Sequence, residues 1–165
     1  MVISREDVVG RSTGKATIVL ERGPLTRFAE AVTEASPIYR RRDAAQAAGF
    51  ADIPAPPTYF FSAAAYWGAF PEAQPSDADP PANPMMEVMG ELLGQGGMIL
   101  HGEQEFTYHR PVVAGERLSS ESVVVDYYAK ESGERTMTFL VTETTYRDEQ
   151  DALVLMARMN LIHRS

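Results

Sequence analysis

The amino-acid sequence predicts an α+β fold in one domain: a single strand, then helices, then four long antiparallel strands. The chain has 165 residues, a length that suits one domain with its own core. Residues 14–21 have the composition of a strand, and the segments after them carry apolar residues at helical spacing. From residue 98 onward, strand-like segments alternate with turn signals, which favours a sheet built largely from the second half of the chain.

Short helices and proline turns are expected after the first strand. Apolar residues recur at helical spacing over residues 24–34, and Pro24 suits the first turn of a helix. Ser36 precedes Pro37 and should end this helix, because a residue before proline avoids the α region. A second short helix is predicted over residues 43–48.

Residues 58–70, which read TYFFSAAAYWGAF, are predicted to form a buried central helix. The segment is apolar nearly all round, and its alanines would let a sheet wrap closely around it. A proline-rich acidic loop and a short helix over residues 85–93 should follow. We therefore treat residues 71–97 as a proline- and glycine-rich insertion within a single domain spanning residues 1–165.

The remaining strands are expected to form a curved antiparallel sheet around that helix. Alternation of side chains is clear where Met137, Phe139 and Val141 interleave with Thr138, Leu140 and Thr142. Such a sheet wrapped on one long helix is a hot-dog fold. The four predicted strands cover residues 98–110, 118–130, 136–146 and 152–163.

Composition excludes several classes of protein. The formal net charge of −8 disfavours nucleic-acid binding, which needs a clustered basic face. The chain has no cysteine, and His101 and His109 lie eight residues apart on one strand, so we expect no metal and no cofactor. No apolar signal core or stretch of about 20 apolar residues is present, so we expect no membrane span and a cytoplasmic location. The run Arg40-Arg41-Arg42 is either a solvated helix start or a clamp for the phosphates of a thioester carrier.

Three local patterns occur in a characteristic order: a helix end with a proline turn, a proline-rich entry into the next element, and a strand running into a Pro-Val turn. They read FAEA to SPIY at residues 28–39, IPAPPTY at residues 53–59, and LHGEQEFTYHRPV at residues 100–112. Together they resemble the MaoC-like dehydratases, the family of (R)-specific enoyl-thioester hydratases and fungal-type fatty-acid-synthase dehydratase domains. The resemblance implies a hot-dog dimer, hetero- or homomeric, that binds an acyl-CoA or acyl-carrier-protein thioester. It also implies reversible addition of water across a 2-enoyl double bond.

The same resemblance points to catalytic positions that are altered here. Active relatives carry a Gly-Asp-x-Asn-Pro-x-His turn, whose Asp and His hold the water. Residues 33–39 read TEASPIY, so Glu34 takes the place of the Asp, Ser36 of the Asn and Tyr39 of the His. Burial can tune a carboxylate such as Glu34 into a base, but misplacing its oxygens by about 1 Å can cost about 100-fold. Tyr39, with an ordinary pKa of about 10, cannot replace a histidine near neutral pH. The alternative is that both residues are structural.

The donor for the thioester carbonyl is altered as well. Pro56 and Pro57 stand where relatives supply a backbone N–H, and proline has none. The amides of Thr58 or Tyr59 could serve instead at a helix N-terminus, or Thr58 could be only a helix cap. We expect the substrate-binding residues to be Ser36, Pro57, Thr58, Tyr59, His101 and Gly102.

Three functional hypotheses follow. In the first, the chain is the acyl-binding subunit of a heterodimeric hydratase or dehydratase whose partner carries the intact Asp/His pair. In the second, it is an active homodimer that uses Glu34 and Tyr39. The third is a non-catalytic protein that binds an acyl-CoA or another hydrophobic small molecule. A hot-dog thioesterase is disfavoured, because residues 58–70 contain no carboxylate.

Overall fold

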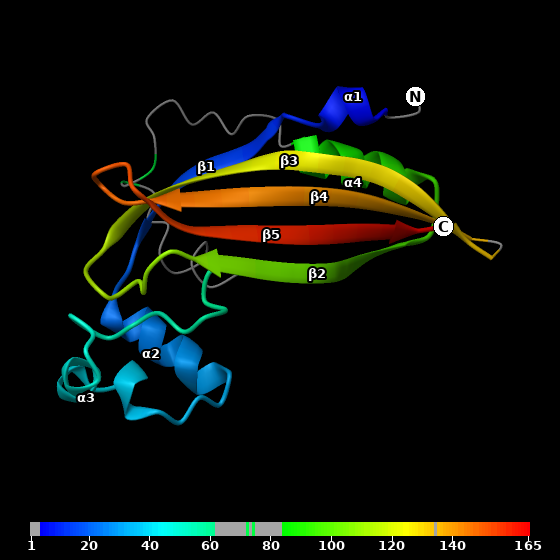
Figure 1. Ribbon diagram of the computed structural model, residues 1–165. Helices are drawn as coiled ribbons and strands as arrows, with labels where there is room; N and C mark the ends of the chain where they lie inside the picture. Colours follow the sequence, from blue (N-terminus) through cyan, green and yellow to red (C-terminus); the bar gives the residue numbers. More distant parts are fainter. Residues whose placement is uncertain (1–3, 62–71, 73, 75–83, 134) are drawn as a thin grey trace.

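A curved five-stranded antiparallel sheet forms the body of the protein, and its strand order is β1-β3-β4-β5-β2 (Figure 1). The computed structural model describes residues 4–61, 72, 74, 84–133 and 135–165. The predicted strands are confirmed, with ends shifted by up to two residues. They are β1 (Ser12–Val19), β2 (Met98–Tyr108), β3 (Arg117–Ser132), β4 (Arg135–Arg147) and β5 (Leu153–Arg164).

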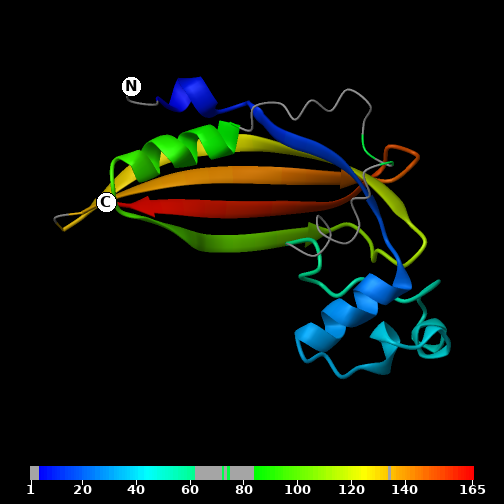
Figure 2. The same ribbon diagram turned by 180° about the vertical axis from the view of Figure 1, so that it is seen from behind.

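Two groups of helices flank the sheet. One group projects from one end of the sheet and is called the overhang here, residues 22–47 (Figure 1). It consists of α2 (Arg22–Ala31), η1 (Pro37–Tyr39) and α3 (Arg42–Ala47). The other group consists of α1 (Arg5–Val8) and α4 (Pro84–Gly94), near the opposite end (Figure 2). The predicted helices at residues 24–34, 43–48 and 85–93 are therefore confirmed, and α1 and η1 were not predicted.

The core is divided into two apolar clusters, one toward each end of the sheet. The overhang cluster gathers where the overhang joins the sheet, and Leu25 of α2, Tyr59 and Leu155 are among its buried members. The α4 cluster joins Val88 and Leu92 of α4 to the sheet, through side chains that include Val124 of β3 and Leu140 of β4. Burial of apolar surface in these two clusters positions the overhang and α4.

Residues 58–61 begin the segment predicted as the central helix. In the described part they form turns: the Tyr59 amide donates to the Pro56 carbonyl at 2.9 Å, and the Phe61 amide to the Thr58 carbonyl at 3.1 Å. Residues 62–70, the remainder of that prediction, lie outside the described residues. In the described part of the chain, α4 packs across one face of the sheet, where its apolar side chains form the α4 cluster (Figure 2).

The turn between α4 and β2 is fixed by a buried histidine. His163 is 2% exposed, and its Nε2 lies 2.7 Å from the carbonyl oxygen of Gly96. Gly97 has a φ of 86°, and a Cβ there would lie 2.2 Å from the carbonyl oxygen of Arg164, so only glycine fits. None of the helices in the described part has the length and apolarity that a membrane crossing requires.

Candidate functional site

The overhang turn, residues 33–39, follows α2, includes η1 and carries the predicted catalytic positions. Thr33 has a φ of 57°, in the left-handed region that a β-branched residue rarely adopts. This is the position at which the related motif has glycine, a residue that adopts the left-handed conformation readily. Holding threonine in this conformation costs on the order of 1–3 kcal/mol, which the surrounding structure must offset.

Glu34 is partly buried, and its carboxylate bonds within the turn. Its Oε1 accepts a hydrogen bond of 2.8 Å from the backbone N–H of Ser36. The guanidinium of Arg40 holds the same turn from outside by donating to the carbonyls of Glu34 and Ser36. Glu34 and Ser36 therefore meet within the turn, and one oxygen of the carboxylate helps to fix its conformation.

Tyr39 is the last residue of η1 and of the overhang turn, and its phenol stays neutral. Burial raises the pKa of its phenol, and the negative charge of Glu34 raises it further. Its backbone carbonyl accepts a hydrogen bond of 2.9 Å from Thr26 Oγ1, which ties η1 to α2. Tyr39 can donate a hydrogen bond, but it cannot accept a proton as a general base near neutral pH.

A pocket of about 420 Å³, called the overhang pocket here, opens between the overhang and the end of β2. Tyr108 lines it from β2, and its hydroxyl donates a hydrogen bond of 2.7 Å to the Pro57 carbonyl. Burial raises the pKa of the Tyr108 phenol, with smaller contributions from Tyr146 and Tyr39. The pocket has a predominantly apolar lining, made by Tyr39, Phe50, Pro54, Ala55, Pro57, Tyr108, His109, Arg110, Pro111 and Val112.

Of the expected substrate-binding residues, Pro57 lines this pocket, whereas Tyr59 is packed in the overhang cluster. Tyr59 is fully buried, its ring meets Phe28 and Phe60 edge-on, and its amide is bonded to Pro56. The Tyr59 amide is thus occupied in this structure and is not a free carbonyl donor. Burial also raises the pKa of Tyr59 to about 12. The Thr58 amide remains the candidate at the entry of this segment.

His101 and Gly102 lie far from the overhang turn within one chain. They are on β2, and His101 is seven residues before Tyr108, roughly 23 Å along the strand. The exposed His101 ring packs edge-on against Phe61, with centroids 4.8 Å apart. Gly102 lies at a register shift where a Cβ would come within 2.7 Å of the Ile162 side chain. Their contribution to the overhang pocket of their own chain is therefore not supported by the geometry.

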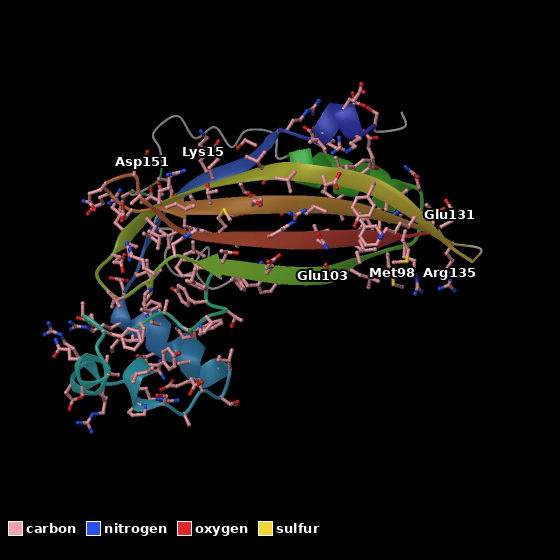
Figure 3. All side chains as sticks on the ribbon, viewed as in Figure 1. Lys15, Met98, Glu103, Glu131, Arg135 and Asp151 are labelled. Carbon is pink, nitrogen blue, oxygen red and sulfur yellow. The ribbon has the colours of Figure 1, made fainter. Side chains whose placement is uncertain are left out.

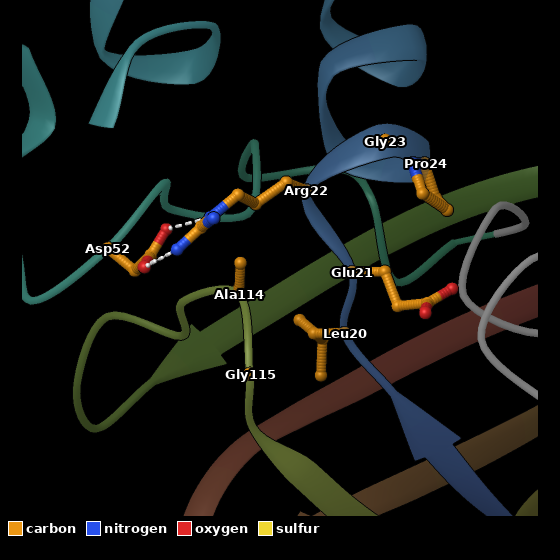
Figure 4. Close-up of a pocket in the computed structure, with 8 residues that line it drawn as sticks. All are labelled: Leu20, Glu21, Arg22, Gly23, Pro24, Asp52, Ala114 and Gly115. Carbon is orange, nitrogen blue, oxygen red and sulfur yellow. Dashed lines mark hydrogen bonds and ion pairs between the residues drawn. The ribbon is translucent and has the colours of Figure 1, made fainter.

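The arginine run does not form a free phosphate clamp. Arg41 pairs with Asp43, and Arg42 lies 3.2 Å from Asp52. Asp52 also receives two hydrogen bonds from Arg22, of 2.9 and 2.6 Å, which hold the pKa of its carboxyl well below the usual range (Figure 4). Since Arg40 is bonded to the overhang turn, each of the three guanidinium groups has a protein partner. The solvated-helix interpretation agrees better with these contacts.

Sequence reasoning missed a second pocket on the other side of the overhang. It has a volume of about 590 Å³, and the Arg22–Asp52 ion pair forms part of its wall (Figure 4). Thirty positions separate these partners, so no local pattern could indicate their contact. Across the described residues, no group of three or more metal-ligating side chains comes together.

The curved sheet with an overhang at one end defines the class of protein: a MaoC-like hot-dog fold. Two solved complexes from Mycobacterium tuberculosis show this fold. The truncated HadBC complex, a 3R-hydroxyacyl-ACP dehydratase, matches with a TM-score of 0.67 and 20% identity over 96% of this chain and 99% of that one. The ChsH1–ChsH2 complex matches with a TM-score of 0.71 and 20% identity over 92% and 83%.

The chain belongs to the family described as FAS1-like, dehydratase domain region, which matches residues 7–157. A UPF0336 protein of Parafrankia sp. is 32% identical over 96% of this chain and 93% of the relative. A UPF0336 protein of Streptomyces coelicolor is 36% identical over 72% and 70%. A probable enoyl-CoA hydratase alpha subunit of Thermomonospora curvata is 29% identical over 84% of this chain and 43% of its own length. The predicted fold and family are confirmed.

Proposed function

We propose that this chain is the acyl-binding subunit of a heterodimeric (R)-enoyl-thioester hydratase or 3-hydroxyacyl-thioester dehydratase. The proposal rests on one observation: the overhang turn lacks the Asp/His pair but lies beside a predominantly apolar pocket. The Glu34 carboxylate accepts the Ser36 amide, and Tyr39 stays protonated. Hydration requires a base for water and an acid for Cα. One oxygen of the Glu34 carboxylate is engaged by the Ser36 amide, and Tyr39 does not supply the histidine of the Asp/His pair.

The overhang pocket has the composition expected for the acyl end of a thioester. Its lining is largely proline, aromatic and aliphatic, and the polar groups that face it are neutral phenols and the rim residues His109 and Arg110. A site of this kind takes up an apolar chain and orients one polar end. The ligand class is therefore an acyl thioester carried by CoA or an acyl carrier protein.

A free sheet edge supports a hot-dog partner. β2 is the last strand of the sheet, so the side of its backbone away from β5 is unpaired in the described chain. Met98 and Leu100 on this strand are 46% and 39% exposed, and Met98 and Glu103 mark its course in Figure 3. An exposed strand edge with apolar side chains favours pairing with another strand. The two solved complexes named above each contain two different chains, which favours a heteromeric partner.

The alternative is an active homodimer, and the proximity of Glu34 to Tyr39 favours it. The two groups are close enough for the carboxylate to raise the pKa of the phenol. If the second oxygen of Glu34 held water while Tyr39 donated a hydrogen bond, slow hydration would be possible. A binder without any catalytic partner is the third possibility.

The deciding experiment measures binding and turnover of the purified full chain with 2-enoyl-CoA and saturated acyl-CoA esters. We expect binding by calorimetry without hydration, and hydration once a partner carrying Gly-Asp-x-Asn-Pro-x-His is added. Glu34→Gln should leave binding intact, because the amide oxygen can still accept the Ser36 N–H. Glu30→Gln, on the exposed side of α2, is the matched control. Turnover by the chain alone that is lost in Glu34→Gln and kept in Glu30→Gln would establish the homodimer instead.

A further inference from the structure

A belt of polar side chains crosses the sheet between the two apolar clusters, on the face that carries α4. Along β4 the side chains on this face run from Leu140 of the α4 cluster, through two threonines, to Tyr146 of the overhang cluster. Along β3 they run from Leu118 of the overhang cluster to Val124 of the α4 cluster, with serines between them. The polar belt consists of Thr13, Gln104, Ser122, Thr142 and Thr144.

Strand pairing brings the members of the belt together. Ser122 lies opposite Thr144 across the β3–β4 ladder. Thr142 and Gln104 both lie opposite Met159 of β5, from its two sides. The polar groups therefore lie in one row across the middle of the sheet, with Met159 of β5 between Gln104 and Thr142. Thr142 is buried and the other members are partly buried, at a depth where apolar side chains are common.

The belt lines a cavity of about 110 Å³, which also touches Phe60, Phe61, Tyr146, Ala157 and Met159. Thr142 is 4% exposed. Gln104 donates from Nε2 to the Arg158 carbonyl at 3.1 Å, but its Oε1 is buried and has no hydrogen-bond partner within the described chain. A buried acceptor without a partner costs free energy, so its retention calls for a donor that enters the cavity.

Phe60 separates this cavity from the overhang pocket. Its ring lines the cavity and meets the ring of Tyr108, which lines the pocket, with centroids 6.3 Å apart. It also contacts Tyr146 at 5.0 Å, and the Tyr146 hydroxyl donates to the Phe60 carbonyl at 3.4 Å. A chain extending from the overhang pocket toward the middle of the sheet would pass this ring and then meet polar groups.

We propose that the polar belt binds a hydroxyl group at the end of the acyl chain remote from the thioester, so that the protein selects terminally hydroxylated acyl thioesters over those with an unsubstituted end. This inference rests on the proposed function, because the thioester end must occupy the overhang pocket. The ligand hydroxyl donates to Gln104 Oε1 and accepts from a threonine hydroxyl of the belt. The belt then sets which substituent is accepted, and the overhang pocket sets where the thioester lies.

The test compares straight-chain acyl-CoAs from butyryl to decanoyl with their terminally hydroxylated counterparts, by calorimetry on the full chain. At the chain length that reaches the belt, we expect the hydroxylated ester to bind about fivefold more tightly or better, as one buried hydrogen bond would give. Gln104→Leu should abolish this preference, because the ligand hydroxyl then loses its acceptor. Gln46→Leu is the matched control, since Gln46 also donates from Nε2 to one backbone carbonyl, that of Ala51, and lines none of these pockets.

Thr142→Val provides a second, nearly isosteric variant should Gln104→Leu fold poorly, and it should reduce the same preference. Equal affinity for both series at every length, with measurable binding, would overturn the hydroxyl site and leave the proposed function standing. An absence of binding to either series would overturn both. A preference that persists in Gln104→Leu and Thr142→Val would place the hydroxyl elsewhere and overturn the assignment to the belt.

Discussion

The overhang turn and the polar belt differ in how their sequence relates to their chemistry. The turn carries a recognisable sequence pattern and has a left-handed residue at Thr33, where the related motif has glycine. Its carboxylate and phenol nevertheless replace the Asp and His of that motif. The belt has no recognisable pattern, yet it contains a buried acceptor without a partner in the described chain. A sequence motif can thus indicate a backbone conformation, whereas a buried polar atom without a partner indicates a candidate position for a ligand group.

The largest change in stability is expected for Phe60, which separates the overhang pocket from the cavity lined by the polar belt. Phe60 is 4% exposed and meets three aromatic rings, whereas its neighbour Phe61 is 50% exposed. Phe60→Ala should lower the free energy of unfolding by about 3–5 kcal/mol, and Phe61→Ala by less than about 1 kcal/mol. Urea denaturation of both variants measures this difference. Similar losses in the two would mean that Phe60 is not a packed wall.

A smaller effect is expected where the overhang turn is held from outside. Arg40 is partly buried and donates to two carbonyls of the turn, so Arg40→Ala should destabilise the protein by about 1–3 kcal/mol. Arg41, in a solvent-exposed pair with Asp43, is the matched control, and Arg41→Ala should leave stability unchanged. Thermal denaturation of the pair checks the prediction. If Arg40→Ala also weakens acyl-CoA binding, the turn contributes to the pocket as well as to stability.

Much of the fold was predictable from sequence, because its signals are local. Side-chain alternation located the strands. The stop expected at Ser36 was wrong in position, because α2 already ends at Ala31 and Thr33 takes the left-handed conformation just after it. Alternation alone does not say which face of a strand is inward. Phe139 faces away from α4 and stacks on Tyr128 with centroids 4.7 Å apart, whereas the polar Thr142 is buried on the face toward α4. The belt was therefore not foreseeable.

The proximity of the candidate site residues could be predicted from sequence, whereas their hydrogen bonds could not. Glu34, Ser36 and Tyr39 lie in one turn because their spacing along the chain is short, and their role in catalysis stays a prediction. The use of Glu34 to bond the Ser36 amide depends on the backbone angles of that turn, which composition does not encode. The engagement of Asp52 by Arg22 and Arg42 depends on long-range packing for the same reason.

A further test relieves the strain at the start of the turn. Thr33→Gly removes the side chain from a residue with a φ of 57°, so it should raise the free energy of unfolding by roughly 0.5–1 kcal/mol after the added freedom of the unfolded chain is counted. The same change two residues earlier, Ala31→Gly at the end of α2, should instead lower stability by about 0.5–1 kcal/mol. Chemical denaturation of both variants gives the two signs. Destabilisation by Thr33→Gly would mean that the threonine side chain has contacts that outweigh its strain.

The smallest effect concerns the pH dependence of stability from the ion pair beside the overhang. Arg22 lowers the pKa of Asp52 in the folded protein below its ordinary value of 3.8. Because the folded pKa is depressed, this contribution is present above pH 4 and is lost as pH falls further. Asp52→Asn should therefore destabilise the protein at pH 6, and the difference from the unsubstituted protein should shrink between pH 4 and pH 2. Denaturation curves over this range test the idea, with Asp151→Asn in the exposed β4–β5 turn as control. A difference that stays constant with pH would show that Asp52 acts through packing rather than charge.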